Sequence, residues 1–114
     1  LCRPDDFQAN LYLGAILYKR RDLPAARTCL EKAAALKPKS TRARYELALV
    51  KRADGDLKAA VAELQSVTRQ DPNWLDPHVE LAALYYKLHR PADGLRQRQI
   101  VQKLMAERQK QGPK

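Results

Sequence analysis

The chain repeats a pattern at a fixed interval. Pro4, Pro38 and Pro72 stand 34 positions apart, and short turn-like segments recur at the same interval. A period of this length is typical of repeat architectures, in which each unit is one supersecondary element that buries its apolar face against its neighbours. The chain of 114 residues holds three such units, so the repeat constrains the fold more than any single motif does.

Aligning the chain on this interval brings chemically similar residues together. Small residues fall where the two helices of one unit must approach closely, and larger leucines alternate with them, so that ridges pack into grooves. The aligned sets are Leu13-Gly14, Leu47-Ala48 and Leu81-Ala82; Ala26, Ala60 and Gly94; and Leu30, Leu64 and Arg98.

Each unit is predicted to form a helix, a tight turn and a second helix. Apolar residues recur at helical steps, as at Leu13 and Leu17, and Asp6, Ser40 and Asn73 stand where they can cap a helix. The pattern predicts helices near 7–20, 24–36, 41–53, 58–70, 75–88 and 92–109, with turns at 21–23, 37–40, 54–57, 71–74 and 89–91.

The same register predicts the core. The residues expected to be largely buried are Leu13, Leu17, Ala26, Leu30, Leu47, Ala60, Leu64, Leu81 and Tyr85.

The first two units, with Leu13-Gly14…Ala26-x-x-x-Leu30…Pro38 and Leu47-Ala48…Ala60-x-x-x-Leu64…Pro72, resemble the tetratricopeptide repeat, a helical hairpin of the same length. The third unit matches in its first helix, with Leu81, Ala82 and Tyr85, but its second helix departs from the family pattern. There Gly94 replaces the usual Ala, Arg98 the usual large apolar residue and Ala106 the usual Pro. The resemblance implies an all-α, right-handed helical solenoid of three repeats with six antiparallel helices.

This resemblance also divides the chain. Repeats are expected at 7–40, 41–74 and 75–108, the last with a capping second helix, followed by a frayed tail at 109–114. Residues 1–6 are interpreted as the remnant of a preceding repeat, so we expect the chain to be an excerpt of a longer array. The first helix would then expose an apolar face, including Tyr12 and Ile16, that supports weak self-association.

Composition excludes several classes of protein. With 45% hydrophobic residues, 31% charged residues and only four Gly, the chain has the composition of a soluble, helix-rich globular protein. Its apolar runs are too short to span a membrane, and no signal peptide is visible, so no membrane partner is expected. The compartment is left open, with the cytoplasm as the default.

The net charge of +9 is concentrated towards the end of the chain, where residues 87–114 carry 8 Lys and Arg against 2 Asp and Glu. Such a basic segment suggests nucleic-acid binding, and the simpler interpretation is a set of solvated helix faces. No aromatic residues are interleaved with the basic ones in this segment, which disfavours nucleic acid as a partner.

No pattern for catalysis or metal binding is present. The sequence lacks a Gly-rich phosphate loop, HExxH and CxxC, and His78 and His89 stand at opposite ends of one predicted helix. Cys2 and Cys29 are too few for a disulfide framework, and Cys29 is interpreted as a small buried hydrophobe. We therefore predict no enzyme activity, no cofactor, no metal and no small-molecule substrate.

In the tetratricopeptide family the first helix of each repeat lines a concave groove, and the resemblance therefore implies a set of groove residues. They are Leu11, Tyr12, Ala15, Tyr18, Lys19, Arg42, Tyr45, Leu49, Arg52, Val79, Ala83, Tyr86 and Lys87, with Gln8, Glu46, Asp76 and Glu80 also facing it. Family members that clamp a C-terminal carboxylate use Lys, Asn and Arg; the corresponding positions here, Leu11, Ala15, Glu46, Asp76 and Glu80, exclude that ligand.

These residues predict a protein–protein interaction scaffold that holds a peptide or partner helix in a Tyr-lined groove. Tyr combines a large apolar area with a hydroxyl at low entropic cost, and Tyr45 of the middle repeat is the expected principal anchor. Two alternatives stay open: the tyrosines cover seams between helices, or the basic last helix binds nucleic acid.

Overall fold

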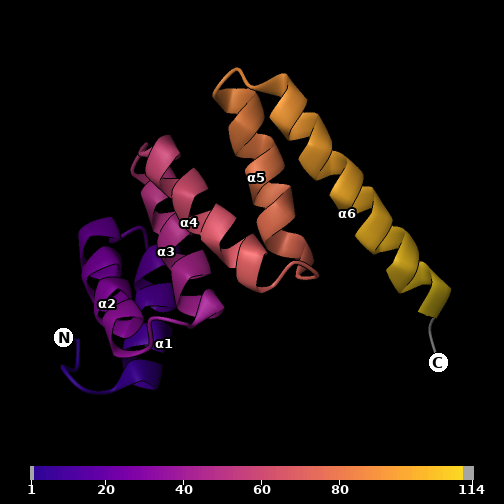
Figure 1. The fold of residues 1–114 in the computed structure, drawn as a ribbon. Coiled ribbons are helices and arrows are strands. Elements are labelled where there is room, and N and C mark those ends of the chain that lie inside the picture. The colour runs from indigo at the N-terminus through magenta and orange to yellow at the C-terminus, as the bar shows by residue number, and fades with distance from the viewer. Residues whose placement is uncertain (1, 112–114) are drawn as a thin grey trace. The chain divides into compact units, whose positions relative to one another are not determined.

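The computed structural model describes residues 2–111, and over that range it contains six helices and no strand (Figure 1). The helices are α1 (Phe7–Lys19), α2 (Leu23–Leu36), α3 (Thr41–Ala53), α4 (Leu57–Gln70), α5 (Leu75–Lys87) and α6 (Pro91–Gln111). The all-helical prediction is confirmed. The prediction that the last helix ends at 109 is wrong, because α6 continues to Gln111. Residue 1 of the expected remnant and residues 112–114 of the expected tail lie outside the described range.

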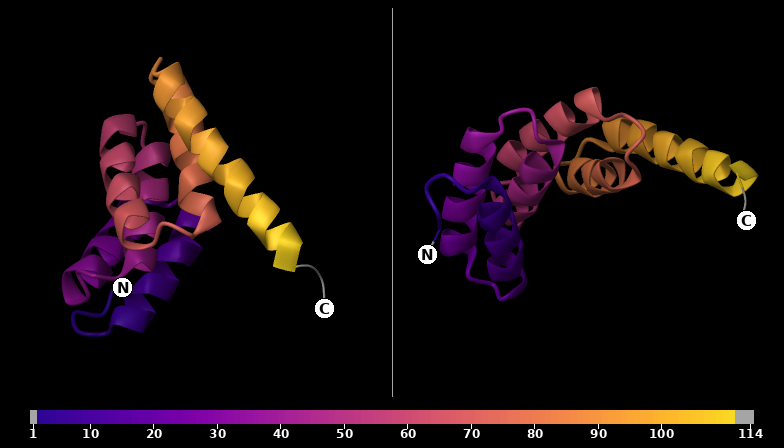
Figure 2. Two further views of the ribbon diagram at one scale, coloured as in Figure 1. Left: turned by 45° about the vertical axis from the view of Figure 1, so that its right-hand side comes forward. Right: turned by 90° about the horizontal axis from the view of Figure 1, so that it is seen from below.

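The chain divides into two compact units, one ending at Glu63 and the other beginning at Leu64, with the boundary inside α4. In the first unit, α2 packs against both α1 and α3. In the second unit, α5 packs against α6, and the views in Figure 2 show each pair as neighbouring helices. The unit of structure is thus a helical hairpin, as the repeat predicts.

A cluster of apolar side chains from three helices forms the core of the first unit. Ala26, Leu30, Leu47 and Val50 are buried in it, and half-buried Leu11, Leu17, Tyr18 and Leu23 pack around them. Seven of the nine predicted core residues are buried: Ala26, Leu30, Leu47, Ala60, Leu64, Leu81 and Tyr85. The other two, Leu13 and Leu17, are only half-buried, because α1 is covered by neighbours on one side only in this unit.

The first hairpin depends on a close approach between its two helices. A Cβ atom added to Gly14 of α1 would lie 2.5 Å from Cγ of Leu30 in α2. The repeat position that holds Gly14 must therefore carry a very small residue for Leu30 to be fully buried there.

The three hairpin turns share one backbone conformation. Arg21, Gly55 and His89 occupy the same position of successive repeats and have φ values of 66°, 87° and 60°. In the first turn the Asp22 N–H donates to the Leu17 carbonyl, and the other two turns repeat this bond. Each first helix therefore ends in a Schellman motif with a left-handed residue, a conformation that favours glycine.

Helix caps agree with the sequence at two of three positions. The Asp6 side chain accepts a hydrogen bond from the Ala9 N–H at 3.0 Å, and the Ser40 hydroxyl accepts one from the Ala43 N–H at 3.2 Å. The expected cap at Asn73 is wrong: Trp74 occupies the N-cap position of α5, and its side chain makes no capping bond.

The segment before α1 is fixed to the first hairpin by a disulfide, which corrects the interpretation of both cysteines. Cys2 is bonded to Cys29 of α2, with 5.3 Å between their Cα atoms. The fully buried Asn10 reinforces this attachment, because its side-chain amide pairs with both the N–H and the carbonyl of Arg3. A disulfide of this kind persists in an oxidising environment.

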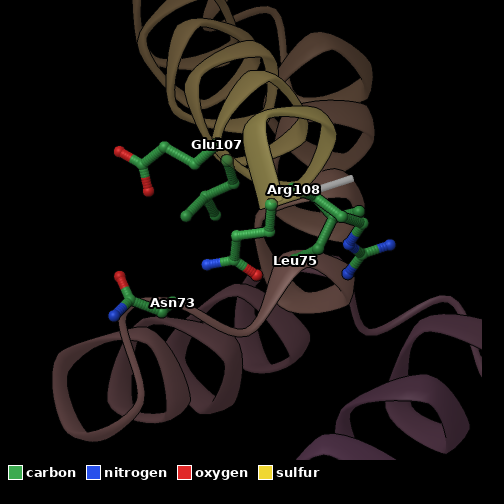
Figure 3. A pocket seen from close by; sticks show the side chains of 6 residues that line it. Asn73, Leu75, Glu107 and Arg108 are labelled. Atoms are coloured by element: carbon green, nitrogen blue, oxygen red, sulfur yellow. The ribbon is translucent and has the colours of Figure 1, made fainter. Parts of the chain in front are cut away.

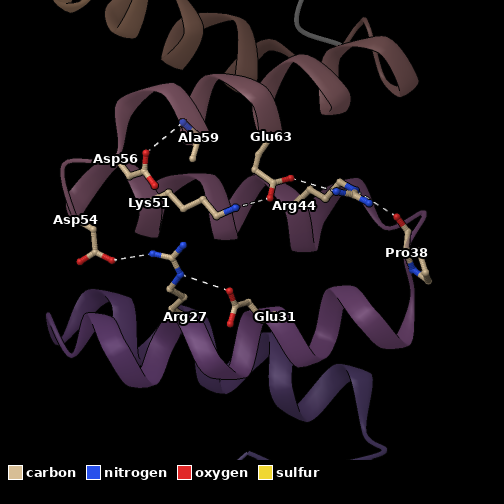
Figure 4. A network of polar contacts seen from close by, with 9 residues as sticks. All are labelled: Arg27, Glu31, Pro38, Arg44, Lys51, Asp54, Asp56, Ala59 and Glu63. Carbon is tan, nitrogen blue, oxygen red and sulfur yellow. Dashed lines mark hydrogen bonds and ion pairs between the residues drawn. The ribbon is translucent and has the colours of Figure 1, made fainter.

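Two groups of charged side chains join helices of the first unit, one between α3 and α4 and the other between α2 and the end of α3 (Figure 4). Glu63 accepts from Lys51 Nζ at 2.7 Å and from Arg44 at 3.1 Å, and all three side chains are well covered. Arg27 of α2 forms a separate ion pair, at 3.4 Å, with Asp54 directly after α3. Each of these partly covered charges has an opposite partner, so the ion pairs can order the helices without burying a lone charge.

The shared turn conformation predicts opposite effects of glycine at equivalent sites. Arg21→Gly and His89→Gly should each raise the free energy of unfolding by about 1 kcal/mol, because Gly adopts a positive φ without a Cβ clash. Gly55→Ala should lower it by about the same amount. Urea titration measures these changes. Arg20→Gly, at a neighbouring position with ordinary helical φ, is the control and should not stabilise.

The disulfide predicts a large effect of removing its less buried partner. Cys2→Ser should lower the free energy of unfolding by about 3 kcal/mol, because the bond closes a loop with a sequence separation of 27 residues in the unfolded chain. Guanidinium titration of the oxidised protein measures the loss. A reducing agent should remove the difference between wild type and variant; a difference that persists under reduction would contradict the bond.

Candidate functional site

An open hollow of about 190 Å³ lies between α1 and α3 of the first unit. Its lining comes from positions predicted to face the groove: Gln8, Leu11, Tyr12, Ala15, Arg42 and Glu46. The α1 residues recur at three- and four-residue steps, so they share one face of the helix. The structure thus brings together Leu11, Tyr12, Ala15 and Arg42 from the predicted set.

Tyr12 is the most prominent side chain at this hollow. It is 72% exposed, while Leu11 and Ala15 beside it are half-buried. A ring in this position can lose a large apolar area to a ligand and can still donate its hydroxyl hydrogen.

Glu46 supplies a carboxylate to the same hollow. The residue is only 8% exposed, and Arg42 Nε lies 3.5 Å from its Oε2 one helical turn away. Burial raises the pKa of the Glu46 carboxyl above its ordinary value, and the positive charges of Arg42 and Lys19 oppose that shift. The hollow therefore combines an apolar wall with a carboxylate that the protein solvates poorly.

The expectation for Tyr45 needs correction. Tyr45 in α3 is only 9% exposed, so its ring belongs to the core and offers little surface to a ligand. Tyr18 likewise packs against the core of the first unit. For these two residues, the alternative that tyrosines cover seams between helices describes the structure better than the groove assignment.

The remaining predicted groove residues of the first unit lie outside the lining of the hollow. Lys19 is exposed, and Leu49 and Arg52 are half-buried. Lys19 is close enough to act on the charge of Glu46, so it contributes to the electrostatics of the site without lining it.

The predicted groove residues of the second unit are Val79, Ala83, Tyr86 and Lys87 on α5. All four are exposed, and Lys87 is the last residue of the helix. The Tyr86 ring also packs on the neighbouring helix, because a Cβ atom added to Gly94 would lie 2.9 Å from its Cε2. Gly94 thus makes room for an aromatic ring.

The two histidines have structural surroundings. His78 is buried, and its ring nitrogens lie 2.7 Å from Oε1 of Gln97 and 2.8 Å from the Pro72 carbonyl. His89 occupies a left-handed turn position. Within residues 2–111, no group of three or more His, Cys, Asp and Glu side chains is placed to hold a metal ion.

A second hollow, of about 200 Å³, lies between the start of α5 and the end of α6 and was not predicted from the sequence (Figure 3). Its lining consists of Asn73, Leu75, Leu104, Glu107, Arg108 and Gln111. It exists because α6 continues past the position where the earlier repeats have Pro38 and Pro72. The sequence feature that could have predicted this extension is Ala106, which stands where the earlier repeats have Pro and permits the helix to continue.

A family model for the tetratricopeptide repeat matches residues 17–85, which is more than half of the chain. The chain belongs to the tetratricopeptide repeat family. This result agrees with the helical hairpins, the regular interval of the left-handed turn residues and the small residue at each close approach. A scaffold for protein interactions is the role that this family and fold support.

Solved structures of the same fold include MamA from Desulfovibrio magneticus RS-1, at 26% identity and a TM-score of 0.87, covering 92% of this chain and 59% of that one. A double mutant of MamA RS-1 gives 25% identity, a TM-score of 0.89 and coverages of 93% and 60%. YrrB, described as a TPR protein with an unusual peptide-binding site, has 22% sequence identity and a TM-score of 0.81. The match covers 88% of this chain and 52% of that one. This chain therefore spans less than two thirds of the length of each of these proteins. No curated protein matches the sequence significantly.

The helices within residues 2–111 differ from membrane-spanning helices. None of them combines the length and the apolar character that a membrane span needs.

The raised pKa of Glu46 predicts a pH-dependent effect of Glu46→Gln. A folded-state pKa above the unfolded one gives stability that is complete below the unfolded value and is lost as pH rises through the folded value. Gln does not ionise, so the difference in free energy of unfolding should shift in favour of Gln as pH rises from the ordinary Glu pKa of about 4.3 towards neutrality. Urea titrations across this range measure the shift.

Glu107→Gln, at an exposed site on α6, gives the baseline for removing one carboxylate. A Glu46→Gln difference that moves in favour of Glu as pH rises would mean that Arg42 and Lys19 outweigh burial.

Proposed function

We propose that this chain is a non-catalytic protein-interaction module that binds a peptide or a partner helix on the face of α1 and α3. The observation that carries this proposal is the hollow in which the exposed Tyr12 stands beside Leu11 and the buried carboxylate of Glu46. The family supports it in general terms, and the fold shared with YrrB is one on which a peptide-binding site has been described.

The lining indicates the chemistry of the ligand. An apolar side chain can cover Leu11 and Ala15 and displace water from the face of Tyr12. Glu46 accepts hydrogen bonds, so a ligand that brings a backbone N–H or an amine to this wall compensates its buried charge. Arg42 and Lys19 at the border attract acidic residues on either side of the apolar anchor.

Nucleic-acid binding by the basic last helix is the alternative. The described residues of α6 include Arg96, Arg98, Lys103, Arg108 and Lys110, but no aromatic side chain on which a base could stack. We therefore favour peptide binding at the face of α1 and α3 over nucleic-acid binding at α6. The two functions differ in how they respond to salt.

Binding should depend on Tyr12. Peptides enriched from a display library of random linear sequences should bind Tyr12→Ala more weakly than wild type by about 1–3 kcal/mol, because the anchor residues of an interface carry most of its energy. Isothermal titration calorimetry measures the change. Leu36→Ala, which trims an exposed apolar side chain of α2 in the same unit, is the matched control and should bind normally.

Salt dependence separates the two functions. Peptide binding should weaken little with salt, whereas a single-stranded oligonucleotide that contacts the Arg and Lys residues of α6 should give a steep fall of affinity with salt. Unchanged peptide binding by Tyr12→Ala, together with tight and salt-sensitive oligonucleotide binding, would overturn the proposed function.

A further inference from the structure

A third hollow lies between α5 and α6 and has no counterpart in the proposed function. It measures about 250 Å³ and is lined by Val79, Ala82, Arg98, Val101 and Gln102. Val79 is 45% exposed, although it is an apolar residue in the middle of a helix. The second unit therefore presents an apolar groove along a helical hairpin.

The repeat shows what kind of element occupies such a groove. Two repeat lengths earlier, the positions of Val79 and Arg98 are held by Leu11 and Leu30. In that hairpin a helix covers these positions, because Leu47 and Val50 of α3 share one apolar cluster with Leu30, and Leu11 packs against it. The groove between α5 and α6 is thus built from the positions that receive a helix in the first unit.

One residue changes the chemistry of this groove. Leu30 and Leu64, the equivalents of Arg98, are both fully buried. Arg98 is exposed, and among residues 2–111 it forms no ion pair. A helix with a wholly apolar face would bury this guanidinium group without a partner, which is costly. A helix that brings a carboxylate to the same place would avoid this cost, because the carboxylate would accept a charge-assisted hydrogen bond from the Arg98 guanidinium group.

The groove continues along the hairpin. Leu75 lies one helical turn before Val79 on α5, and Leu104 lies one turn after Val101 on α6. These two leucines line the hollow of Figure 3, where Arg108 supplies another cationic side chain and Glu107 one acidic group. The apolar strip is therefore at least two helical turns long and has Arg98 beside it.

The course of α6 disfavours this chain's own next segment as the occupant. α2 ends at Leu36 and is followed by a short turn that brings α3 onto the first hairpin. The equivalent of Leu36 is Leu104, but α6 continues to Gln111, about 10 Å further along the helix axis. The short connection that brings α3 into the groove of the first unit is thus replaced by helix in α6.

We propose that the groove between α5 and α6 docks an amphipathic helix of a partner protein, whose apolar face is interrupted by an Asp or Glu opposite Arg98. Val79, Ala82 and Val101 would contact the apolar residues of that helix, and Arg98 would pair with its carboxylate. This surface is separate from the hollow at Tyr12 and does not depend on the proposed function.

The test uses a display library of amphipathic helices with one randomised position in the centre of a Leu and Ala face. Selection on wild type should enrich Asp or Glu there. A synthetic helix with Glu at this position should bind about ten- to a hundredfold more tightly than its Lys counterpart, as expected for one charged hydrogen bond. Arg98→Glu should reverse this preference, and Arg98→Leu should abolish it while retaining apolar helices.

Lys103→Glu is the matched control, because it makes the same charge change at an exposed position of α6 that lines neither hollow. It should keep the preference for Glu, and so should Tyr12→Ala. Equal affinity of wild type for the Glu and Lys helices, or equal effects of Arg98→Glu and Lys103→Glu, would overturn the proposal. Sedimentation analysis showing a wild-type dimer that Arg98→Glu dissociates would also overturn it, because the occupant would then be a second copy.

Discussion

The close approach of α1 and α2 determines much of the first unit. At Gly14 a single methyl group would collide with Leu30, so the distance between the two helices is set by the smallest side chain available. At that distance Leu30 is buried between the helices, and Leu47 and Val50 of α3 pack in the same apolar cluster. The hollow at Tyr12 is lined by residues of both α1 and α3, so it depends on where this packing places α3 beside α1. A packing constraint inside the hairpin therefore positions the candidate site outside it.

The sequence predicted the helices and most of the core because the same apolar and small residues recur at equivalent positions of each repeat. Helical periodicity and the small residues at Gly14 and Gly94 are local signals. The failures concern properties that depend on distance in space. Register indicates the face on which Tyr45 lies but not the depth to which neighbouring helices cover it. The Cys2–Cys29 bond depends on the path of a short non-helical segment, for which the repeat has no template.

Two carboxylates of similar burial have different roles, and their partners explain why. Glu63 of α4 is held by Lys51 and Arg44 of α3 at 2.7 and 3.1 Å, so these ion pairs join the two helices. Glu46 has Arg42 at 3.5 Å, and burial raises the pKa of its carboxyl. The first carboxylate has its charge compensated within the fold. The second faces an open hollow, where a ligand can add hydrogen bonds that the protein itself supplies only weakly.

The third hairpin keeps the turn and the close helix contact of the others but differs in its side chains and in the length of its second helix. His89 repeats the left-handed turn of Arg21, and Gly94 still permits close contact, here with Tyr86. Leu to Arg at position 30 or 64 would bury a charge among apolar side chains, whereas Arg98 keeps its guanidinium in water. The same repeat can therefore end as a polar surface without any change of fold. Because the apolar neighbours Val79 and Val101 remain beside Arg98, that surface keeps the shape that receives a helix and selects for its charge.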